Sequence, residues 1–483
     1  MGISDKFILD VAQSISKNIN ITMVSGKDIH RSYFPNAEII NLGLHPGFYR
    51  KNALQSKYSL SKKIIEEMRG CEIEFLSISD RFSYWNVSVI DRKQFFYDIL
   101  LYWYGIIKSR SIDVVYMHEI AHMGIDTVLF HLLKYLNIPV VNLIPTTRTD
   151  LAMLSEDYRN LPELPMNYLK NKTHREIQET IDADILEDAL SESNDLKYLR
   201  TLKVKDSSSN IFSIASLRLL LSFFKNLVNS KKISLSEFGF YGPITYRYLS
   251  WVNLQKRVSD YFLYKYYLSL TKSYIRECKY IYFPLPVQPE RTSLPMAGVF
   301  NNVILAIDIL SKSLPDGWVL YVKEHPSLYL LYRYDNKQFR DKEFYERISK
   351  MKNVKLLDSS VSSEVLIENS KAVAVLTSST GWEALHKGIP CLVFGHPWYV
   401  KCHSCYAIDS LSSTNEAIDK IVNNTTPEGV LLDQIRFLAF YQKFLVKTTQ
   451  NYHFAKQSNK NYSFLVKNLS ESIEERISKI LSL

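Results

Sequence analysis

Short apolar runs alternate with amphipathic segments through most of the chain. In the first part, four runs have the length and composition of β-strands: residues 21–26, 72–78, 113–117 and 139–144. Between the last two, apolar residues from Ile125 to Leu136 recur at the spacing of one helical face. A strand, a helix and a strand in close succession predict a βαβ unit, and therefore parallel strands.

The same alternation returns in the second half. Strands are predicted at 279–285, 318–326, 353–357, 372–380 and 390–395. Helices are predicted from about residue 300, over 338–350, and up to His386, where Gly388 has the position of a C-terminal cap. We therefore expect an α/β protein with two Rossmann-like parallel-sheet lobes. Their strand ends would face one cleft, where open α/β sheets bind ligands.

The middle of the chain differs in composition from the two predicted lobes. A Ser-rich break at 206–210 precedes segment 216–232, which is amphipathic and basic. This segment either lies on an anionic membrane surface or packs on a neighbouring helix with its basic face in water. We expect four parts, the last packing back on the lobes: a first Rossmann-like lobe at 1–150, a helical insertion at 151–265, a second Rossmann-like lobe at 266–430 and C-terminal helices at 431–483.

Composition restricts the class of protein. The 483 residues are 46% hydrophobic and 23% charged, which is typical of a globular chain with more than one domain. A net charge of +9 favours an anionic ligand or an anionic membrane face. No zinc-finger, homeodomain or RNP-type pattern supports nucleic acid as a partner.

Cellular location follows from weaker signals. Five cysteines without framework spacing indicate reduced thiols, and the single CxxC at Cys402 and Cys405 is a weak metal signal. Charged residues interrupt the first apolar segment, and no apolar run reaches the roughly 20 residues of a spanning helix. We expect a cytoplasmic protein, with the inner face of the membrane as a second possible location.

A triple-hydroxyl turn follows the strand predicted at 372–380. Ser378, Ser379 and Thr380 stand where a helix begins, so the hydroxyls and the helix N–H groups predict an anion site. Gly381 would let a phosphate approach the backbone. Alternatively, Thr380 is an N-cap that forms a capping box with Glu383. The two interpretations are compatible.

A second polar motif ends the strand predicted at 318–326. Pro326 cannot continue a β-ladder, so His325 should project into the edge loop. His325 and Lys323 could then stabilise the charge of a departing nucleotide. The alternative is that His325 is only structural.

These motifs resemble a known family. The segments YFPLPVQPERTSLPMAGVF, LYVKEHP and LTSSTGWEALHKGIPCLVFG, in this order, resemble the capsular polysaccharide biosynthesis family of Kdo and pseudaminic acid transferases. The HP pair and the hydroxyl turn also resemble motifs with which bacterial GT-B sialyltransferases hold CMP. The resemblance covers about residues 280–400, is thinner over about 112–147, and implies a GT-B fold.

The resemblance also implies roles for individual residues. His325 would contact the CMP phosphate or ribose, and the hydroxyl turn would bind the phosphate. Arg291 would pair with the carboxylate of an acidic sugar, or else form a structural salt bridge. The full set expected on the donor side is Gln288, Glu290, Arg291, Lys323, His325, Pro326, Ser378, Ser379, Thr380 and Glu383. No metal ion and no other cofactor are expected.

The catalytic carboxylate is expected in the first lobe, in the loop after strand 113–117. Glu119, His122 and Asp126 are the candidates. Ala121 and Met123 stand where the family has Pro and Glu, so the catalytic residue does not transfer directly. Asp126 could instead cap the following helix. His118, Glu119 and His122 match the letters of a zinc-protease motif, but a loop position and the absence of a third ligand argue against it.

The function we expect is transfer of a pseudaminic, Kdo or sialic-type acid from a CMP donor to a surface glycan of capsule or lipopolysaccharide. A first-lobe carboxylate would act as a general base, with inversion, or as a nucleophile, with retention. The resemblance favours retention. Two alternatives remain: a UDP-sugar or CDP-polyol donor, and a non-catalytic, membrane-docked subunit of a capsule assembly.

Overall fold

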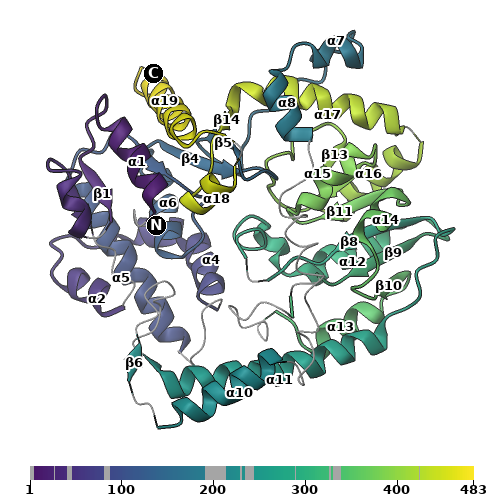
Figure 1. Cartoon of the computed structure of the whole chain (residues 1–483), viewed down its shortest axis with the longest axis horizontal. Helices are drawn as coiled ribbons and strands as arrows, with labels where there is room; N and C mark the ends of the chain where they lie inside the picture. Colours follow the sequence, from purple (N-terminus) through teal and green to yellow (C-terminus); the bar gives the residue numbers. More distant parts are fainter. Residues whose placement is uncertain are drawn as a thin grey trace.

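The computed structural model describes residues 5–26, 28–40, 46–80, 88–190, 214–228, 231–233, 244–288, 290–325, 328–329, 339–423, 425–458 and 460–482. Within them the chain forms two α/β lobes, joined at one end by a pair of long helices (Figure 1). The expected α/β class with two sheet-containing lobes is confirmed.

The second lobe contains a six-stranded sheet with the order β10-β9-β8-β11-β12-β13, and every pairing in it is parallel. Its strands are β8 (Tyr280–Pro284), β9 (Val319–Lys323), β10 (Val354–Leu357), β11 (Ala372–Val375), β12 (Cys391–Val393) and β13 (Cys405–Ala407). The helices between them are α12 (Val303–Ser313), α13 (Lys342–Ser349), α14 (Ser363–Glu368) and α15 (Ser379–His386), and α16 (Leu411–Asn423) follows β13. The strand residues are almost all buried, as expected of a parallel sheet covered on both faces.

The first lobe has a four-stranded sheet with the order β14-β5-β4-β3. Only β3 (Val115–Met117) and β4 (Val140–Pro145) pair in parallel, around α6 (Ile125–Tyr135), as the βαβ pattern predicted. The partner strands β5 (Leu151–Ser155) and β14 (Leu445–Lys447) are antiparallel. This sheet is therefore mixed, and two of its strands come from segments expected to be helical.

Residues 72–78 are the clearest error of the sequence analysis. They lie in helix α4 (Arg69–Asp80) and do not form a strand. Cys71, Phe75 and Ile78 are buried at intervals of four and three residues, which is the repeat of a helical face. A short apolar run is compatible with either element, and here packing against α5 (Val89–Lys108) and α6 decides in favour of the helix.

The remaining elements of the first lobe surround this sheet. They are α1 (Lys6–Ile15), η1 (Asp28–Ser32), α2 (Pro46–Leu54), α3 (Lys62–Glu67) and a parallel pair of β1 (Met23–Ser25) and β2 (Glu38–Ile40). The C-terminal helix α19 (Tyr462–Leu481) packs on α1, and Phe7, Val11, Leu465 and Leu469 share one hydrophobic cluster. The two ends of the chain therefore meet on one lobe (Figure 1).

The insertion contains α7 (His174–Gln178), α8 (Ala183–Leu190), α10 (Ile214–Asn226), β6 (Lys232–Ile233), β7 (Ile244–Thr245) and α11 (Tyr246–Leu270). The Ser-rich break at 206–210 lies outside the described residues. α10 and α11 run side by side along the lower edge of the view in Figure 1, and α11 reaches α13 of the second lobe. On the opposite side, α17 (Pro427–Tyr441) packs on α15 and α7, and η2 (Gly298–Asn301), η4 (Gln442–Phe444) and α18 (Tyr452–Gln457) complete the fold.

Candidate functional site

The candidate site lies at the carboxyl edge of the second-lobe sheet, where the chain reverses its direction of winding. β8 lies between β9 and β11, and the chain continues from β8 to β9 on one side before it returns to β11 on the other. Ligands of open α/β sheets bind in the crevice at such a switch point. The loops after β8, β9 and β11 carry the three donor-side motifs expected from the sequence.

The loop after β8 touches the hydroxyl turn after β11 directly. The Thr377 hydroxyl donates a hydrogen bond to the Thr292 carbonyl, and a Cβ on Gly395 would lie 2.8 Å from the Met296 carbonyl oxygen. Because Arg291 precedes Thr292, this packing places the arginine's loop against Thr377, the residue before the hydroxyl turn. The histidine–proline loop lies at the same edge, on the far side of β8.

The hydroxyl turn has a different cap from the one predicted. Ser378, with extended φ and ψ, is the N-cap of α15, and its Oγ accepts from the Thr380 N–H at 3.2 Å. Glu383 accepts from the Ser379 hydroxyl at 3.0 Å, so the predicted capping box of Thr380 and Glu383 is wrong. The helix begins two residues earlier than a Thr380 cap requires, because Ser378 already satisfies one of its first N–H groups.

Gly381 has a packing role. A Cβ at this position would lie 2.4 Å from the Tyr399 hydroxyl and 2.8 Å from Cys391 Sγ. The glycine therefore allows α15 to approach β12 and the Tyr399 ring closely, which is sufficient reason for its presence without a phosphate.

Lys323 and Glu324 are the structural part of the second motif. The buried Lys323 ammonium donates to the Val361 carbonyl at 2.8 Å and to the Ser363 hydroxyl at 2.7 Å. Both contacts hold the loop before α14 against β9. A direct contact of Lys323 with a nucleotide stays a prediction.

Glu324 has a partner that the sequence analysis missed. Arg340 Nε lies 2.8 Å from Glu324 Oε2, and both side chains are completely buried. The Tyr345 hydroxyl donates to the same oxygen at 2.6 Å, and Oε1 accepts from the His325 N–H at 3.0 Å. Glu324 therefore fixes the backbone from which His325 projects, while Pro326 lies outside the described residues. No local pattern around Arg340 indicated this pairing.

The three catalytic candidates lie in or next to the first-lobe loop after β3, and their hydrogen bonds differ. Asp126 accepts from the backbone N–H groups of His122, Met123 and Thr127 at 3.1, 2.8 and 2.8 Å. It therefore organises the loop and the start of α6. The alternative interpretation of Asp126 as the helix cap is wrong, because the N-cap of α6 is Gly124 and Asp126 lies within the first turn. His122 Nδ1 lies 2.8 Å from the Ile120 carbonyl oxygen.

The neighbouring His118 is structural. Its ring nitrogens contact the Tyr116 hydroxyl at 2.8 Å and the Gln450 carbonyl oxygen at 2.6 Å. Burial lowers the pKa of His118 to about 4. The neutral imidazole contacts one partner through each ring nitrogen and so links β3 to the C-terminal segment. Neither ring nitrogen is left to bind a metal ion.

Glu119 is the carboxylate that faces the second lobe. Its Oε2 lies 3.8 Å from Arg291 Nη1 and 3.9 Å from His122 Nδ1, both beyond hydrogen-bond distance. Burial raises the pKa of Glu119, and the Arg291 charge opposes that rise. Arg291 Nε is enclosed and has no hydrogen-bond partner within the described ranges. The structure thus brings together one first-lobe and one second-lobe candidate, both with unused bonding capacity.

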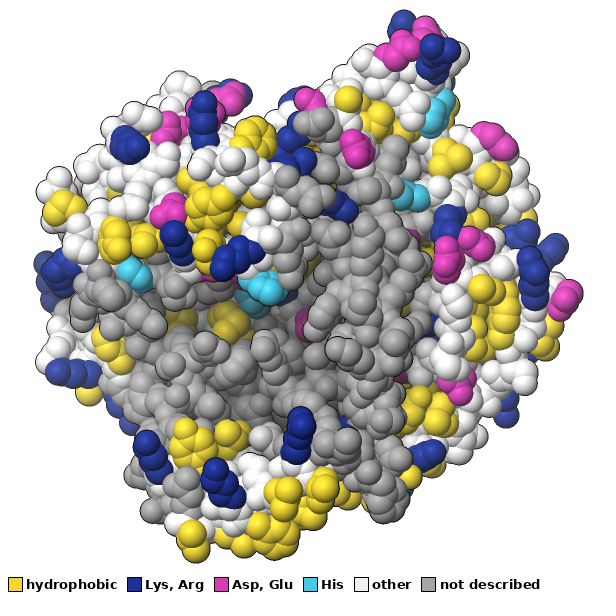
Figure 2. All heavy atoms as spheres, viewed as in Figure 1, with side chains coloured by type: hydrophobic (Ala, Val, Ile, Leu, Met, Phe, Trp, Pro, Cys, Tyr) yellow, Lys and Arg dark blue, Asp and Glu magenta, His cyan; other side chains and the backbone are white. Residues whose placement is uncertain are grey.

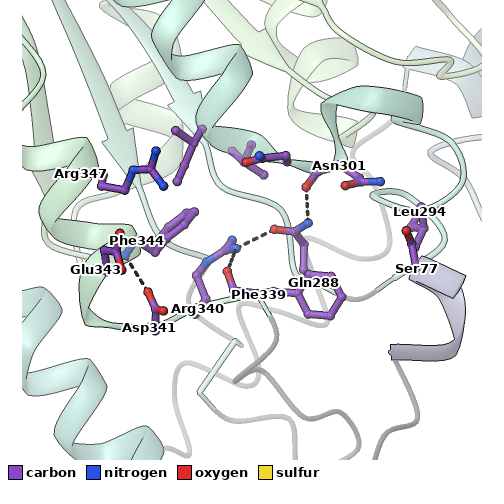
Figure 3. Close-up of a pocket in the computed structure, with 13 residues that line it drawn as sticks. Ser77, Gln288, Leu294, Asn301, Phe339, Arg340, Asp341, Glu343, Phe344 and Arg347 are labelled. Atoms are coloured by element: carbon purple, nitrogen blue, oxygen red, sulfur yellow. Dashed lines mark hydrogen bonds between the residues drawn. The ribbon is translucent and has the colours of Figure 1, made fainter. Parts of the chain in front are cut away.

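A pocket of about 410 Å³ opens beside the loop that follows β8, between α4 and the start of α12 and α13 (Figure 3). Gln288 forms part of its wall, donating to the Asn301 carbonyl at 2.8 Å and accepting from Arg340 at 2.6 Å. Ser77 of α4 contributes the first-lobe side. Gln288 is therefore buried and bonded, so its role is to shape the pocket. Glu290 accepts through its backbone carbonyl from the Ser293 and Leu294 N–H groups and closes the turn that follows.

Metal-binding groups are sparse. Among the described residues, no cluster of three or more His, Cys, Asp or Glu side chains has the geometry to hold a metal ion. Cys402 and Cys405 are buried free thiols, and His403 of the CxxC segment contacts the Leu164 carbonyl oxygen at 3.1 Å.

Residues 299–454, roughly a third of the chain, match the family described as capsule polysaccharide biosynthesis protein. This segment is therefore similar to that family. The match includes the histidine loop, the hydroxyl turn and α17, and it confirms over this range the resemblance inferred from the sequence motifs. Arg291 and Glu119 lie outside it. No curated protein sequence matches the chain.

Three similar solved structures show how distant the relatives are. The β-Kdo 2,7 transferase of KpsC from Thermosulfurimonas dismutans has 16% identity over 47% of this chain and 67% of its own, with a TM-score of 0.25. The β-Kdo 2,4 transferase of the same KpsC has 11% identity over 73% and 86%, with a TM-score of 0.29. MnaA of S. aureus with UDP has 9% identity over 91% and 90%, with a TM-score of 0.25. Similarities this low carry no argument about function.

Proposed function

We propose that this protein is a glycosyltransferase of capsule polysaccharide synthesis. In this proposal it transfers an acidic sugar of the Kdo, pseudaminic or sialic type from a CMP donor to a surface glycan, in the cytoplasm. The family match over residues 299–454 supports the pathway. The donor chemistry rests on the site.

The observation that carries the proposal is the approach of Glu119 to Arg291 across the two lobes, at 3.8 Å. An ion pair that only stabilises the fold is expected at hydrogen-bond distance, as between Glu324 and Arg340 at 2.8 Å. The longer separation leaves both groups able to accept new partners. An α-keto acid sugar supplies one, because its carboxylate matches the guanidinium fork of Arg291.

The proposed reaction uses groups from both lobes. The bond between the anomeric carbon and the CMP phosphate oxygen breaks, and CMP leaves with the electron pair. The first N–H groups of α15, the hydroxyls of Ser378 and Thr380, and His325 stabilise its charge. A new bond forms between the anomeric carbon and an acceptor hydroxyl oxygen.

Glu119 has two possible roles in that step. As a general base it would take the acceptor proton and the configuration would invert. As a nucleophile it would first form a glycosyl ester, which the acceptor displaces with overall retention. The resemblance to Kdo and pseudaminic acid transferases favours retention, and the anomeric configuration of the product decides between the two.

A donor screen tests the proposal. The purified protein is incubated with an acceptor glycan and CMP-Kdo, CMP-pseudaminic, CMP-legionaminic or CMP-sialic acid, and the product is detected by mass. At least one CMP-sugar should give product in the wild type and much less in Glu119→Gln. Thermal stabilisation by CMP, and not by UDP or CDP, should accompany it.

The same experiment separates the alternatives. Stabilisation by UDP alone, with transfer from a UDP-sugar, would replace the CMP assignment while keeping the two-lobed enzyme. If His325→Ala retains glycan synthesis in cells while changes to α10 abolish it, the protein is a docked, non-catalytic subunit.

A further inference from the structure

The paired helices α10 and α11 expose an unusual amount of apolar side chain. On α10 and the two residues after it, Leu217, Leu221, Phe224 and Val228 are 54%, 59%, 58% and 92% exposed. They stand at intervals of three and four residues, so they form one stripe along the helix. Leu220 and Leu227, at 37% and 39%, border the same stripe.

This stripe does not face the partner helix. Contact with α11 passes through Phe223, whose ring lies 5.5 Å from the Trp251 ring, and through Asn226, which donates to the Ser250 hydroxyl at 2.9 Å. An amphipathic helix of a globular protein normally buries its apolar stripe on its neighbour. Here the contacts to α11 come from other positions, and the stripe stays in solvent.

α11 extends the apolar surface. Trp251, Val258 and Phe262 are 44%, 42% and 58% exposed and follow one another at seven and four residues along one face. Figure 2 shows hydrophobic side chains gathered with lysines and arginines at the lower edge of the molecule, where Figure 1 places both helices. We call the exposed residues of these two helices the hairpin surface.

The charge of this region is one-sided. Residues 214–233 contain Arg218, Lys225, Lys231 and Lys232 and no acidic residue. Residues 244–270 add Arg247, Lys256, Arg257 and Lys265 against the single Asp260, which is paired with Lys256. Residues 214–233 and 244–270 together carry eight basic residues and one acidic residue, of which Lys256, Arg257 and Asp260 are buried and add nothing to the exposed charge.

We propose that the hairpin surface docks the protein on an anionic lipid bilayer, with the apolar stripe in the headgroup region. Large exposed apolar patches mark interaction sites, and an apolar face bordered by basic residues is the signature of a helix that lies in a membrane interface. An exposed tryptophan also suits that depth, because its ring is apolar and its N–H is polar. No described helix is both long enough and apolar enough to cross a bilayer, so the contact is with the surface.

Charge favours a bilayer over a second copy of the chain. Two copies meeting through this surface would bring two strongly basic regions together and would require compensation that the hairpin surface does not contain. An anionic leaflet supplies both the negative charge and an apolar layer in one partner. The inference is independent of the transfer reaction, because lipid binding can be measured without a donor sugar.

Co-sedimentation of the full-length protein with vesicles tests the proposal. One set contains phosphatidylglycerol and phosphatidylcholine in equal parts, and the other contains phosphatidylcholine alone. The protein should sediment with the anionic vesicles, less with the neutral ones, and less at high salt. The double variant Leu221→Glu with Phe224→Glu should weaken binding ~100-fold. Arg218→Glu with Lys225→Glu should weaken it ~10-fold or more.

A matched control uses exposed apolar residues far from the hairpin. Leu411 and Val422 on α16 are 44% and 52% exposed, and Leu411→Glu with Val422→Glu should leave vesicle binding unchanged. The unfolding temperature of each variant shows whether it is folded. Three results would overturn the proposal: no wild-type binding to anionic vesicles, equal loss in the α16 control, or a concentration-dependent dimer that the hairpin variants abolish without any wild-type lipid binding.

Discussion

The two loops that carry histidine and glutamate at the sheet edges differ in how fully their polar groups are bonded. In the second lobe, Glu324 is completely buried and bonded to Arg340, Tyr345 and the His325 N–H. In the first lobe, Glu119 is only partly buried, and its nearest cation is 3.8 Å away. Similar residue types at similar positions therefore serve opposite purposes.

Bonding capacity explains the difference. A buried carboxylate with every oxygen satisfied contributes to the fold, because removing a partner leaves an uncompensated charge. A carboxylate with a loose partner costs little to rearrange and can meet a substrate. The same contrast recurs inside the first-lobe loop, where Asp126 is bonded to three N–H groups and Glu119 has no hydrogen bond among the described residues.

The largest expected effect is on activity. Glu119→Gln keeps the shape of the side chain and removes the base or nucleophile, so kcat/KM should fall by roughly 10²–10⁴-fold with whichever CMP-sugar supports transfer. The free energy of unfolding at neutral pH should not fall, because burial disfavours the ionised carboxylate that the substitution removes. Asp113→Asn, at an exposed position two residues before β3, should change neither value. Full activity in Glu119→Gln would remove this residue from the mechanism.

The opposite result is expected in the second lobe. Arg340→Met leaves Glu324 buried without its cation, and the free energy of unfolding should fall by about 3–5 kcal/mol in urea denaturation. Arg347→Met, in the exposed part of α13, should cost less than about 0.5 kcal/mol. If the free energy of unfolding falls equally in the two variants, the buried pair of Glu324 and Arg340 does not stabilise the loop after β9.

Asp126 should behave like Glu324 and unlike Glu119. Asp126→Asn weakens three charge-assisted hydrogen bonds, so thermal or urea unfolding should show a loss of about 1–3 kcal/mol. The loss of activity in Asp126→Asn should be smaller than in Glu119→Gln, because it arises only from disturbance of the loop after β3. A variant with unchanged stability and a Glu119-like loss of kcat would show that Asp126 reacts with the substrate.

The smallest effect is on pH dependence. Burial raises the pKa of Glu119, so the acid limb of the kcat/KM profile should lie above the ordinary glutamate range. The Arg291 charge favours the ionised carboxylate and opposes this rise, so Arg291→Gln should move the limb to higher pH.

Stability should follow the same titration. With a raised native-state pKa, Glu119 favours folding at low pH, and this contribution is lost as pH rises through that pKa. Glu119→Gln should remove this slope in a series of unfolding measurements at different pH. A limb that does not move in Arg291→Gln would contradict the electrostatic contact.

The sequence predicted the second lobe better than the first for a physical reason. A parallel sheet covered on both faces produces continuous apolar strands, and β8 to β12 were all recognised from such runs. β5 and β14 were missed because they are short antiparallel strands recruited from segments with helical neighbours. Residues 72–78 failed because Phe75 and Ile78 fit a helical face as well as a strand.

The site was predictable where the signal was local. The hydroxyl turn and the edge positions of Lys323 and His325 follow from strand ends, although the N-cap is Ser378 and not Thr380. The contact of Glu119 with Arg291 joins residues far apart in sequence, and each had been selected only as one of several candidates. Arg340 was missed altogether, because the pattern around it resembles that of any exposed helix start.

A crystal structure of the protein with bound CMP tests the central claim most directly. The account predicts the phosphate at the N-terminus of α15, within hydrogen-bond distance of Ser378 or Thr380. The phosphate oxygen that carries the sugar in the donor should point toward Arg291 and Glu119. A nucleotide bound on another face of the sheet, or a phosphate beyond reach of this turn while Glu119 and Arg291 remain paired, would contradict it.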